Sequence, residues 1–199
     1  MKIAILSDIH ENFHNLILAL QDAEKRNVEY ILCLGDLMNT GIARILSIQK
    51  VPVYLIWGNN DGEKVDIMRA AFKEGSNLVV ALSTYDFLDL GGKKIFITHY
   101  DDLAKPMAES GRYDAIFYGH NHLKNIERVK NTFVVNPGEI CAQKTGMSSY
   151  AIYDTESNTV ELIELEKIVT LKTDFVDQYM KDNMDKLAFR SEKSFKLDK

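Results

Sequence analysis

The sequence predicts an α/β protein with two β-sheets. Its first 75 residues alternate short apolar runs, typical of buried strands, with longer amphipathic segments of helical spacing. After Gly75 the pattern becomes rich in strands, and turn sequences such as Gly91-Gly92 join the apolar runs. A chain of 199 residues with 46% hydrophobic residues is long enough to bury one full core. We therefore expect one domain over residues 1–165 and a C-terminal helical extension over residues 166–199.

Three strand–loop–helix units are predicted before Gly75. The strands are apolar on both faces, as in a parallel sheet that is covered on two sides. In the first helix, Leu16, Leu20 and Ala23 recur at helical spacing and predict one buried face. His14, near the start of this helix, is interpreted as an exposed loop histidine in preference to a catalytic residue. The predicted strands are residues 2–6, 30–34 and 51–57, and the predicted helices are residues 13–26, 42–49 and 63–73.

The rest of the chain is predicted to form mainly strands and hairpins. One helix is expected at residues 103–110, with Pro106 tolerated in its first turn. A last helix near residues 174–189 carries an apolar stripe, which predicts packing on its own domain or on a partner subunit. The predicted strands are residues 78–82, 85–90, 94–98, 113–118, 126–129, 132–135, 150–154 and 159–165.

Composition and charge exclude several classes of protein. The net charge of −5 and pI near 5.6 leave no global basic field for a nucleic-acid backbone, so nucleic acid is expected only as a small nucleotide-type substrate. Cys33 and Cys141 suit reduced thiols better than a disulfide framework. No signal peptide and no apolar run near the roughly 18 residues of a membrane span is present, so the predicted location is the cytoplasm and no membrane partner is expected.

Side chains of metal-ligand type stand just past five predicted strands. Two of the five histidines bracket Asn121 in the segment that follows residues 113–118. Loops at the carboxyl ends of strands converge on a common crevice in open α/β sheets, so these side chains are expected to meet. Each residue alone is a weak signal, and their joint placement carries the prediction. The seven residues are Asp8, His10, Asp36, Asn59, His99, His120 and His122.

The ligand types indicate the chemistry of the site. Oxygen and imidazole ligands without thiolate suit Mn, Fe, Co, Ni or Zn and disfavour a cysteine-rich structural zinc site. Seven ligands exceed the needs of one ion, and a carboxylate can bridge two. Two divalent ions would outweigh the charges of Asp8 and Asp36, so the site is expected to attract anions despite the acidic chain.

The ordered motifs resemble those of the calcineurin-like metallophosphoesterases, in particular their compact bacterial and archaeal phosphodiesterases. The resemblance covers residues 1 to about 165 and implies a two-sheet β-sandwich flanked by helices, with four αββα layers. It implies two divalent ions, with Mn2+ expected first and Fe, Ni, Co or Zn as alternatives. It assigns Asp8, His10 and His122 to one ion, Asn59, His99 and His120 to the other, and Asp36 to both. The motifs are Ser7-Asp8-Ile9-His10, Gly35-Asp36, Gly58-Asn59-Asn60-Asp61, His99, Gly119-His120-Asn121-His122 and, as a structural turn, Asn136-Pro137-Gly138.

Two positions depart from the pattern of that family. Many members have a histidine after the ligand asparagine, which can protonate the leaving group, whereas this chain has Asn60, which cannot act as an acid. Tyr100 follows His99 where glycine is usual, and it is expected either to line the pocket or to fill it.

These observations predict a dinuclear phosphoesterase that hydrolyses small phosphate esters by in-line attack of a metal-bridging hydroxide, with phosphodiesters preferred over alkyl monoesters. The expected catalytic residues are Asp36, Asn59, Asn60 and His99. The alternative is a scaffold that keeps the fold without strong catalysis, as the retromer subunit of this fold illustrates. A protein phosphatase is disfavoured by Asn60 and the short chain. Homo-oligomer contact through the C-terminal helix is left open.

Overall fold

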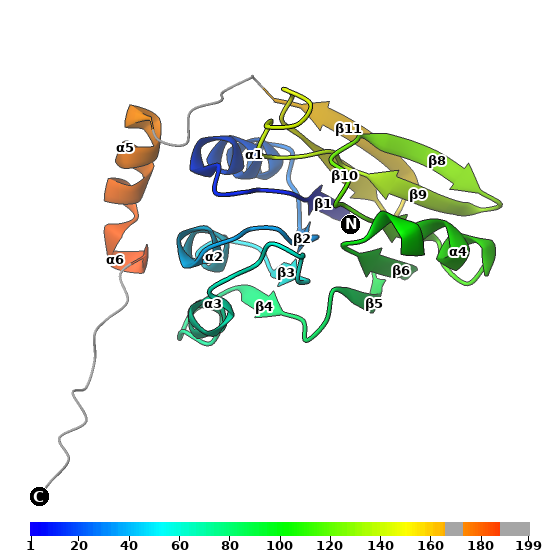
Figure 1. The fold of residues 1–199 in the computed structure, drawn as a ribbon, viewed down its shortest axis with the longest axis horizontal. Coiled ribbons are helices and arrows are strands. Elements are labelled where there is room, and N and C mark those ends of the chain that lie inside the picture. The colour runs from blue at the N-terminus through cyan, green and yellow to red at the C-terminus, as the bar shows by residue number, and fades with distance from the viewer. Residues whose placement is uncertain (166–172, 188–199) are drawn as a thin grey trace, which may run out of the picture.

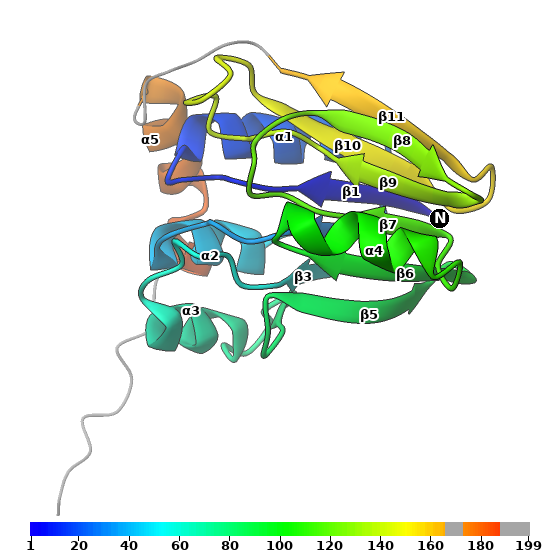
Figure 2. The same ribbon diagram turned by 45° about the vertical axis from the view of Figure 1, so that its right-hand side comes forward.

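Side chains alternate between the two faces of each strand, so both faces of each sheet can be covered, and the protein forms four layers. The computed structural model describes residues 1–165 and 173–187 of the chain. Figures 1 and 2 show two sheets packed face to face, with α1, α2 and α3 outside one sheet and α4 outside the other. The predicted αββα sandwich is therefore confirmed.

The first sheet contains six strands in the order β11-β10-β1-β2-β3-β4. The four strands from the amino-terminal half pair in parallel, and the last two extend the sheet with antiparallel pairing. The strands are β1 (Lys2–Leu6), β2 (Tyr30–Cys33), β3 (Val53–Leu55), β4 (Leu78–Val80), β10 (Ser149–Asp154) and β11 (Thr159–Glu164).

Three helices connect the parallel strands and cover the outer face of this sheet. They are α1 (Phe13–Lys25), α2 (Thr40–Ser47) and α3 (Lys64–Ala71). The side chain of Asn12 accepts the backbone N–H of Asn15 at the start of α1, and Asn39 does the same for Ile42 in α2. Each asparagine satisfies a donor that a helix start leaves unpaired.

The second sheet contains five strands in the order β5-β6-β7-β9-β8. A 3-10 turn, η1 (Asp101–Leu103), leads into α4 (Ala104–Glu109), which covers the outer face. The predicted helix at residues 103–110 is therefore shorter and is preceded by a tighter turn. The strands are β5 (Tyr85–Leu90), β6 (Lys93–Thr98), β7 (Ala115–Phe117), β8 (Asn125–Val129) and β9 (Thr132–Asn136).

Alternate residues of one strand enter different cores. In β1, Ile3 and Ile5 pack between the two sheets, whereas Ala4 and Leu6 pack under the outer helices. Phe96 of β6 belongs to a third core beneath α4. This period of two is why both faces of the central strands are apolar.

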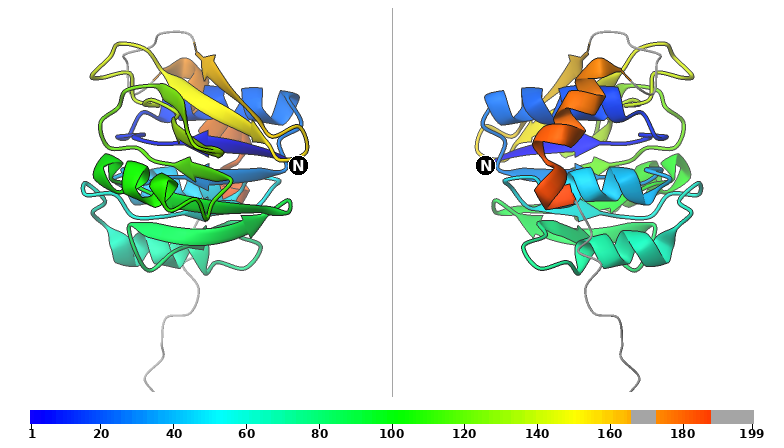
Figure 3. Two further views of the ribbon diagram at one scale, coloured as in Figure 1. Left: turned by 90° about the vertical axis from the view of Figure 1, so that its right-hand side faces the viewer. Right: turned by 90° about the vertical axis from the view of Figure 1, so that its left-hand side faces the viewer.

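The C-terminal helices pack on their own domain. They are α5 (Asp174–Asp182) and α6 (Met184–Leu187), so the predicted helix is interrupted at Asn183, and its last two residues lie outside the described part of the chain. Val176 is buried in the core that contains α1. Figure 3 shows these helices lying across the side of the molecule formed by α1 and α2. Of the two predicted kinds of packing, on the same domain or on a partner subunit, the structure shows the first.

The prediction for His14 was wrong. His14 belongs to α1 and is 6% exposed. Its Nδ1 lies 2.7 Å from Oγ1 of Thr173, and its ring centroid lies 5.0 Å from that of Phe175. The C-terminal segment therefore buries a side chain that local sequence placed in solvent.

None of the described helices has the length and apolar character needed to cross a membrane.

Candidate metal centre

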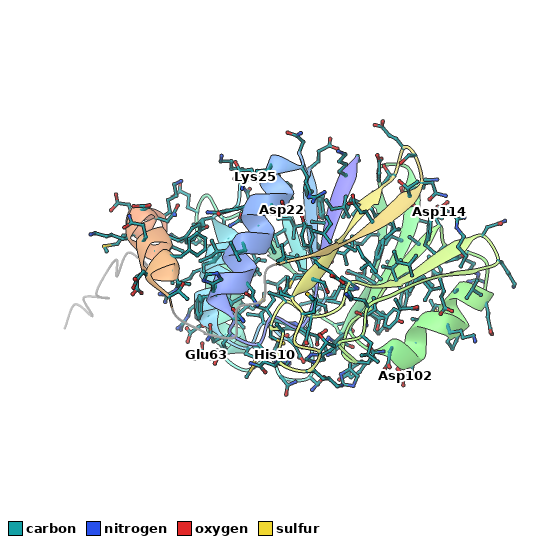
Figure 4. All side chains as sticks on the ribbon, turned by 90° about the horizontal axis from the view of Figure 1, so that it is seen from above. His10, Asp22, Lys25, Glu63, Asp102 and Asp114 are labelled. Carbon is teal, nitrogen blue, oxygen red and sulfur yellow. The ribbon has the colours of Figure 1, made fainter. Side chains whose placement is uncertain are left out.

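The seven predicted ligands all stand beyond the carboxyl ends of strands. The loops that carry them are joined by backbone hydrogen bonds, for example from Ile9 to the carbonyl of Asp36 (3.0 Å) and from Gly119 to the carbonyl of His99 (3.1 Å). Figure 4 shows His10, Glu63 and Asp102 along one margin of the molecule, where these loops lie. Asp8 and His10 follow β1, Asp36 follows β2, Asn59 follows β3, His99 follows β6, and His120 and His122 follow β7.

The first group of polar atoms surrounds Oδ1 of Asp8. This oxygen lies 3.8 Å from Nε2 of His10 and 3.4 Å from Nε2 of His122. Nε2 of His10 lies 3.5 Å from Oδ2 of Asp36. These separations are long for hydrogen bonds, whose usual length is about 2.7–3.2 Å. They approach the roughly 3–3.5 Å expected between two ligands of one ion with bonds of about 2.0–2.2 Å.

The second group of polar atoms surrounds Oδ1 of Asn59. This oxygen lies 2.9 Å from Nε2 of His99 and 2.9 Å from Nδ1 of His120. Oδ2 of Asp36 lies 3.6 Å from Nε2 of His99 as well as near His10. The Asp36 carboxylate therefore stands between the two groups.

Two atoms of the first group are buried without a hydrogen-bond partner among the described residues. They are Oδ1 of Asp8 and Nε2 of His10. Unpaired buried polar atoms are rare and costly, and a cation between them would satisfy both. The donor set thus fits divalent ions, because His10, Asp8 and Asp36 offer ligand atoms that lie within 4.8 Å of one another.

The hydrogen bonds of two histidines fix which ring nitrogen faces the centre. Nδ1 of His99 lies 2.7 Å from the carbonyl oxygen of Leu34, and Nδ1 of His122 lies 2.6 Å from Oε2 of Glu139. Both oxygens can only accept, so each Nδ1 carries a proton and donates. Each Nε2 is then free to offer its lone pair to a metal.

Glu139 is a residue of this centre that sequence reasoning missed. It is 0% exposed, and its carboxylate accepts hydrogen bonds from His122, the Cys141 thiol (2.9 Å), the Lys144 backbone and both the backbone and hydroxyl of Thr145. Burial alone would raise the pKa of Glu139, but these hydrogen bonds outweigh it and hold the pKa well below its usual range. The available signal was an acidic residue directly after the turn at residues 136–138.

Cys141 lies close to the same histidines. Its sulfur, one nitrogen of His10 and one of His122 lie within 4.8 Å of one another. Burial, together with the hydrogen bond to Glu139 and its charge, raises the pKa of the Cys141 thiol, so it remains protonated. A neutral thiol that donates to Glu139 supports the histidine rather than acting as a thiolate ligand.

Five of the seven residues have left-handed backbone conformations. The φ angles are 53° at Asp8, 41° at His10, 56° at Asp36, and 68° at both His120 and His122. Such angles are uncommon for residues other than glycine and gather where surrounding contacts hold the backbone for a function. Two glycines permit close approach of the loops: a Cβ on Gly58 would overlap Asp36, and one on Gly119 would overlap Ser7.

Asn60 and Asp61 both hold the loop of Asp36. The backbone N–H of Asn60 donates to Oδ1 of Asp36, and its side-chain amide donates to Oδ2, each over 2.8 Å. The Asp61 carboxylate accepts from the backbone of Gly58 (2.7 Å), Met38 (2.9 Å) and Asp36 (3.1 Å). Asn60 therefore touches the carboxylate that stands between the two groups, and Asp61 supports its backbone.

Comparisons with known proteins show relatives of this chain. Residues 1–158 match the calcineurin-like phosphoesterase superfamily domain. The phosphodiesterase MJ0936 of Methanocaldococcus jannaschii is 30% identical over 168 residues, which cover 83% of this chain and 100% of that protein. The phosphodiesterase YfcE of Escherichia coli K12 is 25% identical over 185 residues, which cover 85% of this chain and 96% of that protein.

A solved structure of an archaeal phosphodiesterase has a similar fold. It superposes with a TM-score of 0.75 at 29% sequence identity, over 83% of this chain and 100% of the other. Residues 1–158, which match the superfamily domain, contain all seven predicted ligands and every strand of the two sheets except β11, which begins at Thr159.

Proposed function

Since the chain belongs to the calcineurin-like phosphoesterase superfamily, we propose that it is a dinuclear metal-dependent phosphodiesterase acting on small phosphate esters. The proposal rests on buried atoms of Asp8 and His10 that have no hydrogen-bond partner among the described residues and that lie within a cluster of seven ligand-type side chains. The names of MJ0936 and YfcE as phosphodiesterases support the reaction class.

We assign the residues to two ions. Asp8, His10 and His122 would hold the first, and Asn59, His99 and His120 the second, with Asp36 shared. The distances to Asp8 Oδ1, Asn59 Oδ1 and Asp36 Oδ2 support this division. Mn2+ is our first assignment, with Fe, Ni, Co or Zn as alternatives that the same nitrogen and oxygen ligands accept.

The two ions, held by these residues, would supply hydroxide at neutral pH for an in-line attack on phosphorus and would neutralise the phosphate charge. The protein's own contribution is orientation. Leu34 and Glu139 hold the rings of His99 and His122, while Asn60 and Asp61 hold Asp36. These contacts keep the ligands in place before substrate arrives, which removes reorganisation from the reaction.

The proposed preference for diesters follows from Asn60. An amide cannot donate a proton as an acid, and this amide is engaged with Asp36. Loss of a general acid typically costs about 10²–10⁴-fold, so substrates with good leaving groups are favoured.

The experiment compares bis(4-nitrophenyl) phosphate with 4-nitrophenyl phosphate on protein loaded with manganese. We expect the diester to have the larger kcat/KM. A strong preference for the monoester would overturn the proposed substrate class.

The alternative function, a scaffold that retains the fold, is tested by Asp36→Asn. This change keeps the size of the side chain and removes the shared charge. As an enzyme, the protein should lose metal-dependent turnover, and chelation followed by metal addition should abolish and restore it in the parent. An Asp36→Asn protein as active as the parent would favour the scaffold.

We further propose a cytoplasmic protein whose partners are small phosphate esters, including nucleotide-type substrates. The acidic net charge of −5 and the two buried, free cysteines support this proposal.

A further inference from the structure

Tyr100 stands beside the ligands assigned to the second ion. Its ring centroid lies 5.2 Å from that of His99 and 5.2 Å from that of His120, with interplanar angles of 78° and 65°. These are edge-to-face arrangements, which aromatic rings prefer over face-to-face contact. The ring therefore packs against both His99 and His120.

The backbone holds this ring in place. Tyr100 precedes η1, and its N–H donates to Oγ1 of Thr98 over 3.2 Å. The residue is half-buried, so part of the ring stays accessible while part packs on the histidines. Fixed and partly exposed rings supply contact area at a low cost in conformational entropy.

The two residues that follow Tyr100 in the chain, Asp101 and Asp102, are acidic. Asp101 accepts a hydrogen bond of 3.1 Å from Asn121, the residue between His120 and His122. Asp102 is exposed at the same margin of the molecule as His10, as Figure 4 shows. A second anionic group would be repelled by these carboxylates, whereas an uncharged aromatic group would not.

We propose that Tyr100 is a specificity-determining residue that selects phosphate esters carrying an uncharged aromatic group, which packs on its ring while the phosphate occupies the metal centre. This inference rests on the proposed function, because it takes the metal centre as the phosphate site. It assigns to Tyr100 the role of lining the pocket.

The test measures binding of two phosphonates to the manganese-loaded protein by calorimetry. Phenylphosphonate and methylphosphonate differ only in the group beside phosphorus, and their C–P bonds do not hydrolyse like esters. We expect the ratio of their dissociation constants to favour phenylphosphonate. Tyr100→Leu, which retains an apolar side chain, should reduce this ratio about twofold to tenfold, the range to which an aromatic pair contributes. Tyr100→Phe should keep it.

Controls separate this role from a structural one. Phe72→Leu makes the same exchange at an aromatic side chain that is 80% exposed at the end of α3, and it should leave the ratio unchanged. Metal content is measured for each variant, since a loss of metal would lower the affinity for both phosphonates and leave their ratio intact. An unchanged ratio in Tyr100→Leu, or a lost preference in Tyr100→Phe, would overturn the inference.

A third arm uses a nucleoside phosphonate to distinguish two sources of the aromatic group. A gain that depends on Tyr100 in this arm assigns nucleotides, and a gain confined to phenylphosphonate assigns aryl esters. Failure of the inference differs from failure of the proposed function. A protein that hydrolyses diesters while Tyr100→Leu keeps the ratio supports the proposed function and overturns the inference. A protein that binds the phosphonates with the predicted ratios yet hydrolyses nothing supports the inference and overturns the proposed hydrolysis.

Discussion

At the scale of single residues, the centre combines strained backbone with buried charge. Left-handed φ angles at Asp8, His10, Asp36, His120 and His122 each cost on the order of 1–3 kcal/mol unless surrounding contacts compensate. Within the described part of the chain, buried atoms of Asp8 and His10 also have no hydrogen-bond partner. Metal ions that bind the folded chain would offset both costs, because binding to the native state alone stabilises it.

Glu139 should control metal affinity at the first ion through His122. In Glu139→Gln, the new amide N–H group faces the N–H donors of Lys144 and Thr145, and the negative charge is lost. The hydrogen bond that orients the His122 ring therefore weakens. We expect metal affinity at one of the two sites to fall about 10- to 100-fold, measured by titration of the metal-free protein with manganese.

The matched control for this change is Cys141→Ser. Its hydroxyl can still donate to Glu139, so the affinity should stay near that of the parent. Equal weakening of both sites in Glu139→Gln, or none, would contradict the assigned role of Glu139.

At the scale of elements, a buried tyrosine joins α1 to the first sheet. The hydroxyl of Tyr150 in β10 donates to Oδ2 of Asp22 in α1 over 2.6 Å, and Nε of Arg26 donates to the same oxygen over 2.8 Å. Burial alone would raise the pKa of Asp22, but these two hydrogen bonds outweigh it and lower the pKa. The carboxylate form is therefore favoured by folding.

Tyr150→Phe should destabilise the protein by about 1–2 kcal/mol at pH 7, because a hydrogen bond to a charged group is lost. A depressed pKa in the folded state contributes stability above the unfolded value of about 3.9, and this contribution is lost as the pH falls through the folded pKa. The difference in the free energy of unfolding between variant and parent, measured with urea, should therefore become smaller from pH 7 to pH 3. In an Asp22→Asn background, the pH dependence of the difference should vanish.

The hairpin between β8 and β9 carries strain that has no role at the metal centre. Val129 pairs with Thr132, so Lys130 and Asn131 form a two-residue turn, and φ is 55° at Lys130. Turns with a positive φ at the first position favour glycine there. Lys130→Gly should raise the free energy of unfolding by about 0.5–1 kcal/mol, since it removes the steric penalty of the left-handed angle.

The control is Asn131→Gly, because Asn131 has no positive φ and a glycine there only adds freedom to the unfolded chain. Thermal unfolding should show a higher Tm for Lys130→Gly and a lower one for Asn131→Gly. A lower Tm for both would contradict the account of this turn.

At the scale of the whole molecule, the C-terminal segment completes the outer layer. Val176 is 3% exposed beside α1, whereas Met184 is 62% exposed. The predicted ligands all precede residue 158, so the segment stabilises the domain that carries them without supplying a ligand. An oligomer formed through α5 stays a prediction, and its buried apolar side chains are already engaged within one chain.

Ending the chain at residue 165 should lower Tm by about 3–12 °C. Burial of one valine contributes about 1.5–3 kcal/mol, and each kcal/mol corresponds to about 2–4 °C in a chain of this size. Val176→Ala should show part of this effect, and Met184→Ala should show almost none. We expect the shortened chain to retain metal-dependent activity at temperatures below its Tm. Size-exclusion chromatography with light scattering would show whether its mass per particle changes.

The sequence by itself determined the alternation of strands and helices and the residues that follow each strand. Both are local patterns: the period of two in β1 separates Ile3 from Ala4, and strand ends place Asp36 and Asn59 in loops. The tertiary structure alone decided which distant groups meet. Glu139 supports His122, Thr173 contacts His14 across 159 positions, and the ring of Tyr100 lies beside that of His120. Such pairings depend on how layers pack and loops converge, and no local pattern of apolar and polar residues encodes them.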